Sequence, residues 1–219
     1  MTMFRLSGMR PTPRRVLCLG AHSDDIEIGC GGTVLELRRQ RPGIQFHWVV
    51  FSAAGVRAAE ARDSAKRFLG PKSQAAVRLF TFRDGFFPAE FADIKESFER
   101  VAREFQPDIV LTHTRDDRHQ DHRVVSDLTW NTFRRHLVLE YEVPKWDGDL
   151  GRPNCYMPLP ASVAQRKARL LMQGFASQRS KDWFSPETFL GLMRLRGVES
   201  RAPGGYAEAF HLRKVAIGW

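Results

Sequence analysis

The sequence predicts a Rossmann-like α/β protein with a mostly parallel sheet and helices on both faces. Short apolar runs alternate with longer amphipathic runs through the first half of the chain, and polar segments follow the apolar ones. Strands that alternate with helices in this way form a parallel sheet, because each helix returns the chain across the sheet. The 219 residues fit a single domain, with a core over about 14–143 and a C-terminal elaboration over about 144–219.

The elements of the first half follow from their residue patterns in chain order. Residues 16–21 (VLCLGA) have the apolar pattern of a buried strand, and the polar, glycine-rich residues 22–32 predict a turn. A helix is predicted over 33–40, with Thr33 as its N-cap. The elements predicted next are strands over 44–52, 77–82 and 108–113, and helices over 59–69 (ending at Gly70-Pro71), 91–105 and 122–136.

The second half has a less regular pattern. Residues 146–153 (WDGDLGRP) are typical of a turn-rich loop, and helices are predicted over 164–175 and 187–196, with a late strand over 208–215. No linker separates this region from the first half, so we expect it to cover the core instead of folding alone.

Composition and charge exclude several classes of protein. Three cysteines are too few for a disulfide scaffold. No apolar run reaches the roughly 18 residues of a membrane-spanning helix, and no signal-peptide segment follows the basic N-terminus, so we expect a cytoplasmic location. The net charge of +9 is spread over several helices. We therefore expect an anionic small-molecule substrate and no nucleic-acid partner.

Two polar clusters follow predicted strands. The segment GAHSDDIEIGCGGT (20–33) places a histidine and two aspartates directly after the first strand, and HTRDDRHQDH (113–122) follows the strand over 108–113. Ligands of parallel sheets bind outside the carboxyl ends of the strands. We therefore expect the two clusters to face one site.

The residue types in these clusters are those of a metal site. Imidazole and carboxylate ligands suit zinc, and a catalytic zinc takes three protein ligands and keeps a position for water. His22 and Asp25 are three residues apart on the predicted turn, so both can reach one ion, and His122 is the natural third ligand. Similar ligands accept ferrous iron. The sequence therefore predicts a site for zinc, with ferrous iron as the alternative.

The neighbours of these ligands suit metal-assisted hydrolysis. Bound zinc lowers the pKa of its water to about 7, and Asp24 is placed to take the proton of that water. His119, one helical turn before His122, is expected to stabilise an oxyanion as an imidazolium and to protonate a leaving amine. Asp121 is a candidate to hold an imidazole in the required tautomer.

Other interpretations of the same residues stay open. Adjacent aspartates after a strand are common in turns and helix caps. His113 is an alternative ligand or a hydrogen-bond partner, and Asp116 and Asp117 are expected to be loop residues or partners of Arg115 and Arg118. The glycines at 29, 31 and 32 suggest a nucleotide- or S-adenosylmethionine-binding enzyme, although the spacing is not G-x-G-x-x-G and the aspartates repel phosphate. A non-enzymatic binder of anionic polymers is a further alternative.

AHSDDIEIGCGGT and HTRDDRHQDH resemble the two signature motifs of the PIG-L/LmbE-like family of metal-dependent N-acetylglucosamine deacetylases. The resemblance extends over most of the chain, from about Val16 to Arg213. It implies zinc ligands at His22, Asp25 and His122. The same resemblance implies a general base at Asp24 and a charged acid or oxyanion partner at His119.

The resemblance also implies contacts with substrate and a reaction. Arg57, with Glu60 in the same pattern, matches an arginine that contacts substrate in the family, and the implied reaction is removal of an N-acetyl group from an acetylated amino sugar. Ser23 stands where proline is usual, which loosens the loop without removing a ligand. The sugar, its attached group (nucleotide or lipid, for example) and the oligomeric state stay open, a homo-oligomer included.

Two later segments have no assigned role. Trp146 and Asp147 either shape a sugar pocket or form an ordered turn with a buried indole. Glu208 and His211 lie, by the resemblance, near the side of the active site, but their spacing assigns no function.

Overall fold

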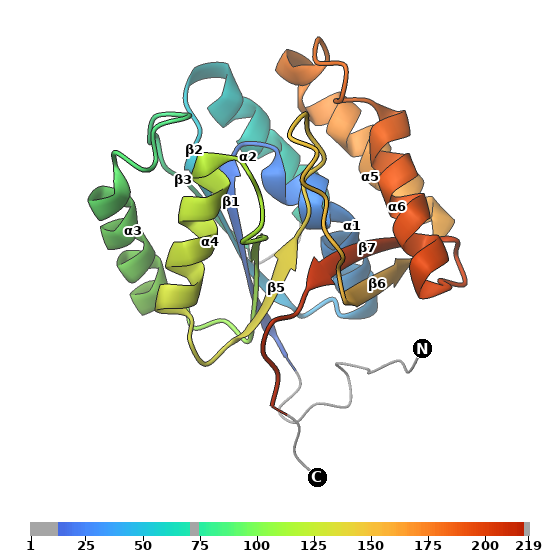
Figure 1. Ribbon diagram of the computed structural model, residues 1–219, viewed down its shortest axis with the longest axis horizontal. Helices are drawn as coiled ribbons and strands as arrows, with labels where there is room; N and C mark the ends of the chain where they lie inside the picture. The colour runs from blue at the N-terminus through green and yellow to red at the C-terminus, as the bar shows by residue number, and fades with distance from the viewer. Residues whose placement is uncertain (1–12, 71–74, 217–219) are drawn as a thin grey trace.

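A seven-stranded sheet forms the centre of the protein in the computed structural model, which describes residues 13–70 and 75–216 (Figure 1). The strands are β1 (Arg15–His22), β2 (Gln45–Ser52), β3 (Ala76–Leu79), β4 (Ile109–His113), β5 (Leu137–Tyr141), β6 (Cys155–Leu159) and β7 (Tyr206–His211). They lie in the order β3-β2-β1-β4-β5-β7-β6. The five strands from β3 to β5 are parallel, and β7 and β6 join as antiparallel additions, so the predicted mostly parallel sheet is confirmed.

Helices cover both faces of this sheet, as predicted. They are α1 (Asp25–Gln40), α2 (Gly55–Leu69), α3 (Phe91–Glu104), α4 (Gln120–Thr132), α5 (Ala161–Gly174), α6 (Pro186–Ser200) and the short 3-10 helix η2 (Ala176–Gln178). Helices α3 and α4 pack on one face, and α1, α2, α5 and α6 pack on the other (Figure 1).

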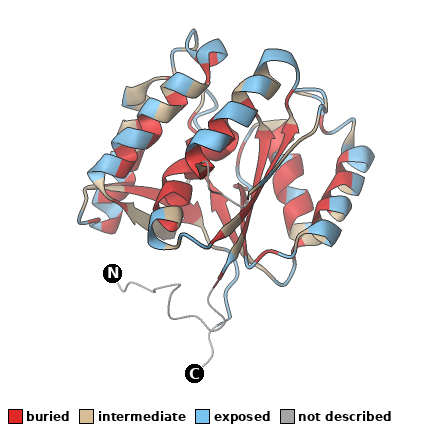
Figure 2. Ribbon diagram, turned by 180° about the vertical axis from the view of Figure 1, so that it is seen from behind, coloured by how far each residue is buried: buried red, intermediate tan, exposed pale blue. Residues whose placement is uncertain are grey.

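The alternation of side chains along β1 divides the core into two layers. Leu17 and Leu19 belong to the cluster under α3 and α4, whereas Val16 and Cys18 belong to the cluster under α1 and α2. Successive side chains of a strand point to opposite faces, so a strand buried on both faces is apolar throughout. Figure 2 shows the result: buried residues fill the central strands and line the helix sides that face them.

The strand order reverses at β1. The chain runs from β1 outward to β2 and β3, and β4 then pairs with the other edge of β1. Ligands of open α/β sheets bind at such a switch point, outside the carboxyl ends of the strands. His22 ends β1 and His113 ends β4, so both predicted clusters lie at this position.

The predicted turn over 22–32 is wrong, because helix α1 already begins at Asp25 and runs through the glycines. The helix breaks only at Cys30, where φ is −141° and ψ is 16°. Glycine is required where partners approach the helix closely: a Cβ at Gly29 would lie 2.1 Å from the Tyr141 ring. Thr33 lies inside the helix and is not its N-cap, a position held by Asp24.

The remaining predicted elements exist, with shifted ends. Helix α2 begins earlier than predicted, α4 ends earlier, and β3 and β7 end earlier; β5 and β6 were not predicted. Pro71 and the N-terminal residues 1–12 lie outside the described residues. Within the part of the chain that is described, no helix combines the length and apolar character needed to span a bilayer.

Candidate active site

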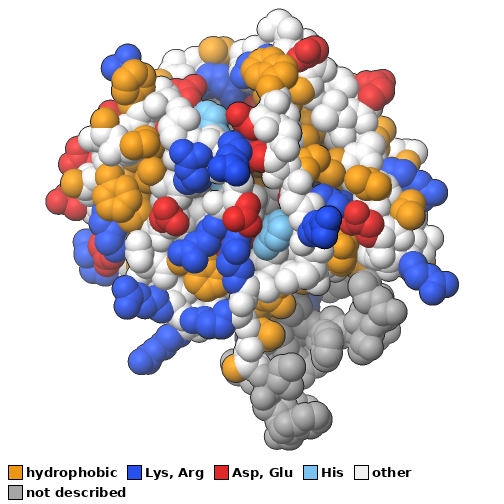
Figure 3. Space-filling model, viewed as in Figure 1, with side chains coloured by type: hydrophobic (Ala, Val, Ile, Leu, Met, Phe, Trp, Pro, Cys, Tyr) orange, Lys and Arg blue, Asp and Glu red, His pale blue; other side chains and the backbone are white. Residues whose placement is uncertain are grey.

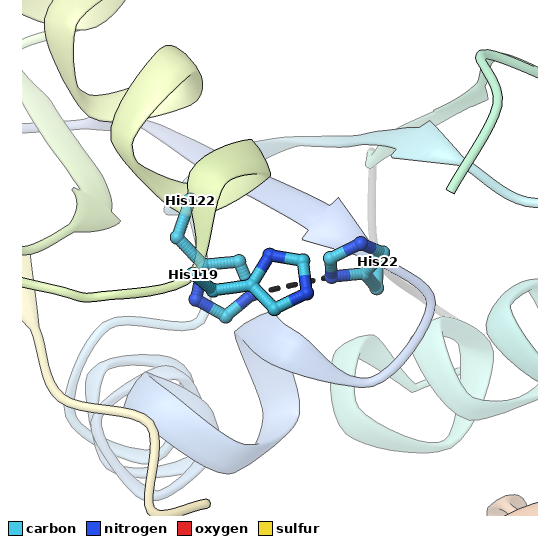
Figure 4. A group of neighbouring side chains, drawn as sticks. All are labelled: His22, His119 and His122. Atoms are coloured by element: carbon cyan, nitrogen blue, oxygen red, sulfur yellow. Dashed lines mark hydrogen bonds between the residues drawn. The ribbon is translucent and has the colours of Figure 1, made fainter. Parts of the chain in front are cut away.

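The two predicted histidine clusters meet at the carboxyl ends of β1 and β4. His22 Nδ1 lies 3.1 Å from His122 Nε2, although one hundred residues separate them in the chain. Figure 4 shows His22 reaching from the end of β1 toward His119 and His122 at the start of α4. The pairing of β1 with β4 brings these segments together.

Three atoms of this cluster, one each from His22, Asp25 and His122, have the spacing of ligands around one metal ion. Asp25 Oδ2 lies 3.3 Å from His22 Nδ1 and 3.4 Å from His122 Nε2, and the two nitrogens are 3.1 Å apart. Bonds of about 2.0–2.1 Å in a tetrahedral zinc site separate the ligand atoms by about 3.4 Å. Overlapping groups in the same cluster, one with His119 and one with His113, also have atoms that could hold an ion. Hence the predicted ligands converge, and their assignment as ligands stays a prediction.

The charge of Asp25 fits this arrangement. Burial opposes the ionised carboxylate, but neighbouring imidazoles, led by that of His122, outweigh it and hold the pKa of Asp25 well below its ordinary value. The carboxylate also accepts the backbone N–H of His22 at 2.6 Å. An ionised aspartate is therefore fixed between the two histidines.

The outward-facing nitrogens of both histidines are held by carboxylates. His122 Nδ1 lies 2.8 Å from Asp117 Oδ2, and His22 Nε2 lies 3.1 Å from Asp121 Oδ2. Histidines that bind metal usually donate their other N–H to such a partner, which fixes the tautomer and the ring orientation. Asp121 contacts an imidazole as expected of a tautomer-holding partner, and its catalytic role stays a prediction. Exposed Asp84 also reaches His22 Nε2, at 3.0 Å.

Asp117 lies in the loop between β4 and α4, as one of its two expected alternatives stated, but the expected pairing with Arg115 or Arg118 is wrong. Besides His122, its carboxylate contacts Lys145 Nζ at 3.0 Å. The signal that could have revealed it is an Asx turn: Asp117 Oδ1 accepts the N–H of His119 two residues on, at 2.8 Å. This turn leaves the second oxygen free to meet His122.

The carboxylate of Asp24 contacts helix α2. Its Oδ1 accepts a hydrogen bond from Arg57 Nη2 at 2.6 Å. Burial raises the pKa of Asp24, and the Arg57 charge opposes that rise only in part. Arg57 also contacts Glu60 at 3.1 Å, and Glu60 in turn accepts the Ser177 hydroxyl at 2.6 Å. The two residues that the resemblance singled out thus lie beside the candidate base, while contact of Arg57 with substrate stays a prediction.

His119 is the N-cap of α4. Its Nδ1 accepts the backbone N–H of Asp121 at 3.3 Å, so Nε2 is the nitrogen that carries a proton toward the site. Burial and the neighbouring His22 lower the pKa of His119, which favours a neutral ring in the free protein. Its function as an imidazolium stays a prediction.

His113 is buried beside the same carboxylate. Its Nε2 lies 3.2 Å from Asp25 Oδ2, and its ring stacks on that of His122 with centroids 3.9 Å apart. The same nitrogen accepts the N–H of Ala21 at 3.0 Å. This hydrogen bond uses the lone pair that a metal ion would need, which favours a positioning role over direct ligation.

The backbone of the glycine-rich segment binds a buried side-chain carboxylate. Glu208 on β7 accepts the N–H groups of Gly32 at 2.7 Å and Thr33 at 2.6 Å, and Lys167 Nζ binds the same carboxylate at 2.6 Å. Backbone amides at the start of a helix are the groups that a phosphate-cradling loop would offer. Because Glu208 already occupies them, the nucleotide-binding alternative loses its proposed site.

The fold and the cluster define an α/β protein with a candidate metal site at the carboxyl ends of its parallel strands. The profile of the PIG-L family, described as GlcNAc-PI de-N-acetylase, matches residues 17–133. This match covers just over half of the chain, so the protein belongs to the PIG-L family, as its two motifs indicated. No curated protein matches the sequence.

Several solved structures share the fold. N,N′-diacetylchitobiose deacetylase from Pyrococcus horikoshii has a TM-score of 0.73 at 21% identity, covering 96% of this chain and 87% of that chain. The zinc-inhibited form of teicoplanin deacetylase Orf2 has a TM-score of 0.67 at 15% identity, covering 90% and 96%. GalB, the 4-carboxy-2-hydroxymuconate hydratase from Pseudomonas putida KT2440, has a TM-score of 0.74 at 21% identity, covering 94% and 99%. At such identities the likeness shows the fold alone, and the fold is common to deacetylases and a hydratase.

Proposed function

We propose that the protein is a zinc-dependent amide hydrolase that removes the N-acetyl group from an amino sugar of the N-acetylglucosamine type and releases acetate. The observation that carries the proposal is the convergence of His22 Nδ1, Asp25 Oδ2 and His122 Nε2 to within 3.4 Å of one another. The description of the PIG-L family and the deacetylases among the solved structures support the choice of reaction.

The donor set fits a zinc ion. Two imidazole nitrogens and one carboxylate oxygen would hold the ion, and Asp117 and Asp121 would hold the outward nitrogens of the two imidazoles. When bound, zinc would polarise the amide carbonyl and lower the pKa of water to about 7. Ferrous iron accepts the same donors.

The protein's own residues would move the protons of the reaction. Asp24 accepts the proton of the attacking water as the new C–O bond forms, and burial of Asp24 raises its pKa toward the range in which a base works near neutral pH. His119 donates a hydrogen bond from Nε2 to the oxygen that gains negative charge. His119 would protonate the amine in its imidazolium form as the C–N bond breaks, and the negative charge on this oxygen would favour that form. The proton taken by Asp24 then passes to solvent, and His119 regains a proton from solvent. Arg57, beside Asp24, would bind substrate.

Three broader expectations belong to the proposal. The net charge of +9 would favour an anionic form of the sugar, such as a nucleotide- or lipid-linked one. The protein would act in the cytoplasm. One deacetylase domain would span residues 1–219.

Acetate release from N-acetylated sugars by the zinc-loaded protein tests the proposal. Chelation should abolish the activity and added zinc should restore it. Asp24→Asn should keep a full complement of metal and lower kcat by about 10²–10⁴-fold, whereas Asp25→Ala should lose the metal. Asp63→Asn, a change of an exposed aspartate on α2, is the matched control. Acetate release that survives chelation, or normal turnover by Asp24→Asn, would contradict the proposal.

A further inference from the structure

One loop leads directly outward from the candidate metal centre. Lys145 Nζ contacts Asp117, whose other oxygen holds His122. Asp149 pairs with the same lysine at 2.5 Å and also accepts the backbone N–H of Arg118 at 2.7 Å. These contacts hold the loop 145–150 against the ligand-bearing segment.

A second loop is connected to the candidate base. Ser177 binds Glu60, and the neighbouring Arg57 binds Asp24, so a chain of contacts links the segment 176–183 to Asp24. The two loops meet where Trp146 Nε1 donates to Asp182 Oδ1 at 2.8 Å.

The indole of Trp146 is fixed but open to solvent. It meets the ring of Trp183 edge-on, with centroids 6.0 Å apart and an interplanar angle of 83°. Even so, Trp146 is 68% exposed, the largest value among the exposed large hydrophobic residues of the described chain. The bond to Asp182 uses the Nε1 edge of the ring. A flat apolar surface held rigid on a loop is typical of a recognition site.

The chemistry around this surface selects a class of ligand. The C–H face of a pyranose ring is apolar, while its hydroxyl groups bond to acceptors at the ring edge. The carboxylate of Asp182 lies at the edge of the indole and suits hydroxyl donors, whereas it repels a phosphate. Lys145 is already paired with Asp117 and Asp149. Figure 3 shows hydrophobic, charged and histidine side chains together on the viewed face of the molecule.

We propose that Trp146, backed by Trp183, is a subsite for a second, uncharged sugar ring attached to the N-acetylated sugar. This inference rests on the proposed function and narrows it: the substrate is a disaccharide or longer glycoside whose second ring packs on the indole, in place of the anionic attached group that the net charge favours. Trp146 then determines specificity without touching the reacting atoms.

Kinetics on two substrates test the subsite. In zinc-loaded protein, Trp146→Ala should lower the ratio of kcat/KM for N,N′-diacetylchitobiose to that for N-acetylglucosamine by about tenfold. Trp146→Phe should recover much of this ratio, because it keeps an aromatic face. Phe91→Ala, at an exposed aromatic residue on α3, should leave the ratio unchanged. An unchanged ratio in Trp146→Ala would overturn the subsite, as would a larger loss for UDP-N-acetylglucosamine than for the disaccharide.

Calorimetric binding separates failure of the subsite from failure of the proposed function. The zinc-loaded Asp24→Asn protein should bind N,N′-diacetylchitobiose more tightly than N-acetylglucosamine, and Trp146→Ala in that background should remove the preference. Absence of acetate release from every sugar by the parent protein would contradict the proposed function alone. Equal disaccharide binding with and without Trp146 would contradict the subsite alone.

Discussion

The buried carboxylate of Glu208 should contribute to the stability of the fold, independently of catalysis. Its two oxygens accept bonds from Gly32, Thr33 and Lys167. Lys167 Nζ also donates to Ile28 O at 2.5 Å, on the other side of the break at Cys30. The pair therefore joins β7 and α5 to both halves of α1.

Glu208→Gln removes the negative charge and leaves the ammonium of Lys167 buried without a counter-charge. Loss of one partner from a buried ion pair costs about 3–5 kcal/mol. For a domain of this size, each kcal/mol corresponds to about 2–4 °C in Tm, so we expect Tm to fall by about 6–20 °C. Urea and thermal unfolding of the metal-free protein, followed by circular dichroism, measure both quantities.

Two further variants separate the ion pair from general effects of the substitution. Glu187→Gln, at an exposed position in the first turn of α6, should change stability by less than about 0.5 kcal/mol. Lys167→Met in the Glu208→Gln background should recover part of the loss, because the unpaired charge is then gone. A Glu208→Gln protein as stable as the Glu187→Gln control would refute this account of the glycine-rich segment.

Three other predictions concern positions around the site and in the core. Asp117→Asn should weaken zinc binding by about 10–100-fold, because it removes the carboxylate that holds His122 Nδ1. Competition with a chromogenic chelator measures the affinity. An effect no larger than that of Asp116→Asn, at an exposed aspartate, would contradict this prediction. Gly29→Ala should destabilise the fold by about 1–3 kcal/mol, because the added methyl group would overlap the Tyr141 ring. Gly43→Ala, with open space around the position, should not destabilise it. Equal urea midpoints for the two variants would contradict this prediction. Burial lowers the pKa of His47 below its ordinary 6.5. Below pH 6.5 the unfolded chain therefore takes up a proton that the folded protein does not. As a result, the free energy of unfolding falls as the pH falls. His47→Phe should reduce this slope between about pH 7.5 and 5.5 in urea titrations (about one unit on either side of the ordinary pKa), and an unchanged slope would show that His47 is not its source.

The sequence predicted the central strands because their signals are local. β1, β2 and β4 are apolar runs, and these runs are buried on both faces of the sheet. β6 was missed because Pro158 interrupts its pattern. Proline cannot donate to a strand ladder, but β6 lies at the edge of the sheet, where this is tolerated.

Interactions between distant segments explain the errors. Glycines 29, 31 and 32 usually indicate a turn, yet they are helical here because side chains from α2, β5, β6 and β7 pack against them. Glu208 is separated from Gly32 by 176 residues. No local pattern could reveal that contact.

The candidate site was predictable to the extent that its chemistry was local. Histidine and aspartate at two equivalent strand ends predicted the convergence of His22, Asp25 and His122. The contact of Asp117 with Lys145 was not predictable, because Lys145 lies on a loop of the irregular second half. The contact of Trp146 with Asp182 likewise joins two such loops.

Anomalous diffraction at the zinc edge, from a crystal of the zinc-loaded protein, tests the central claim most directly. The account predicts one strong peak at about 2.0–2.2 Å from His22 Nδ1, Asp25 Oδ2 and His122 Nε2. A peak on the other side of the His22 ring, among His22 Nε2, Asp84 and Asp121, whose atoms could also hold an ion, would contradict it.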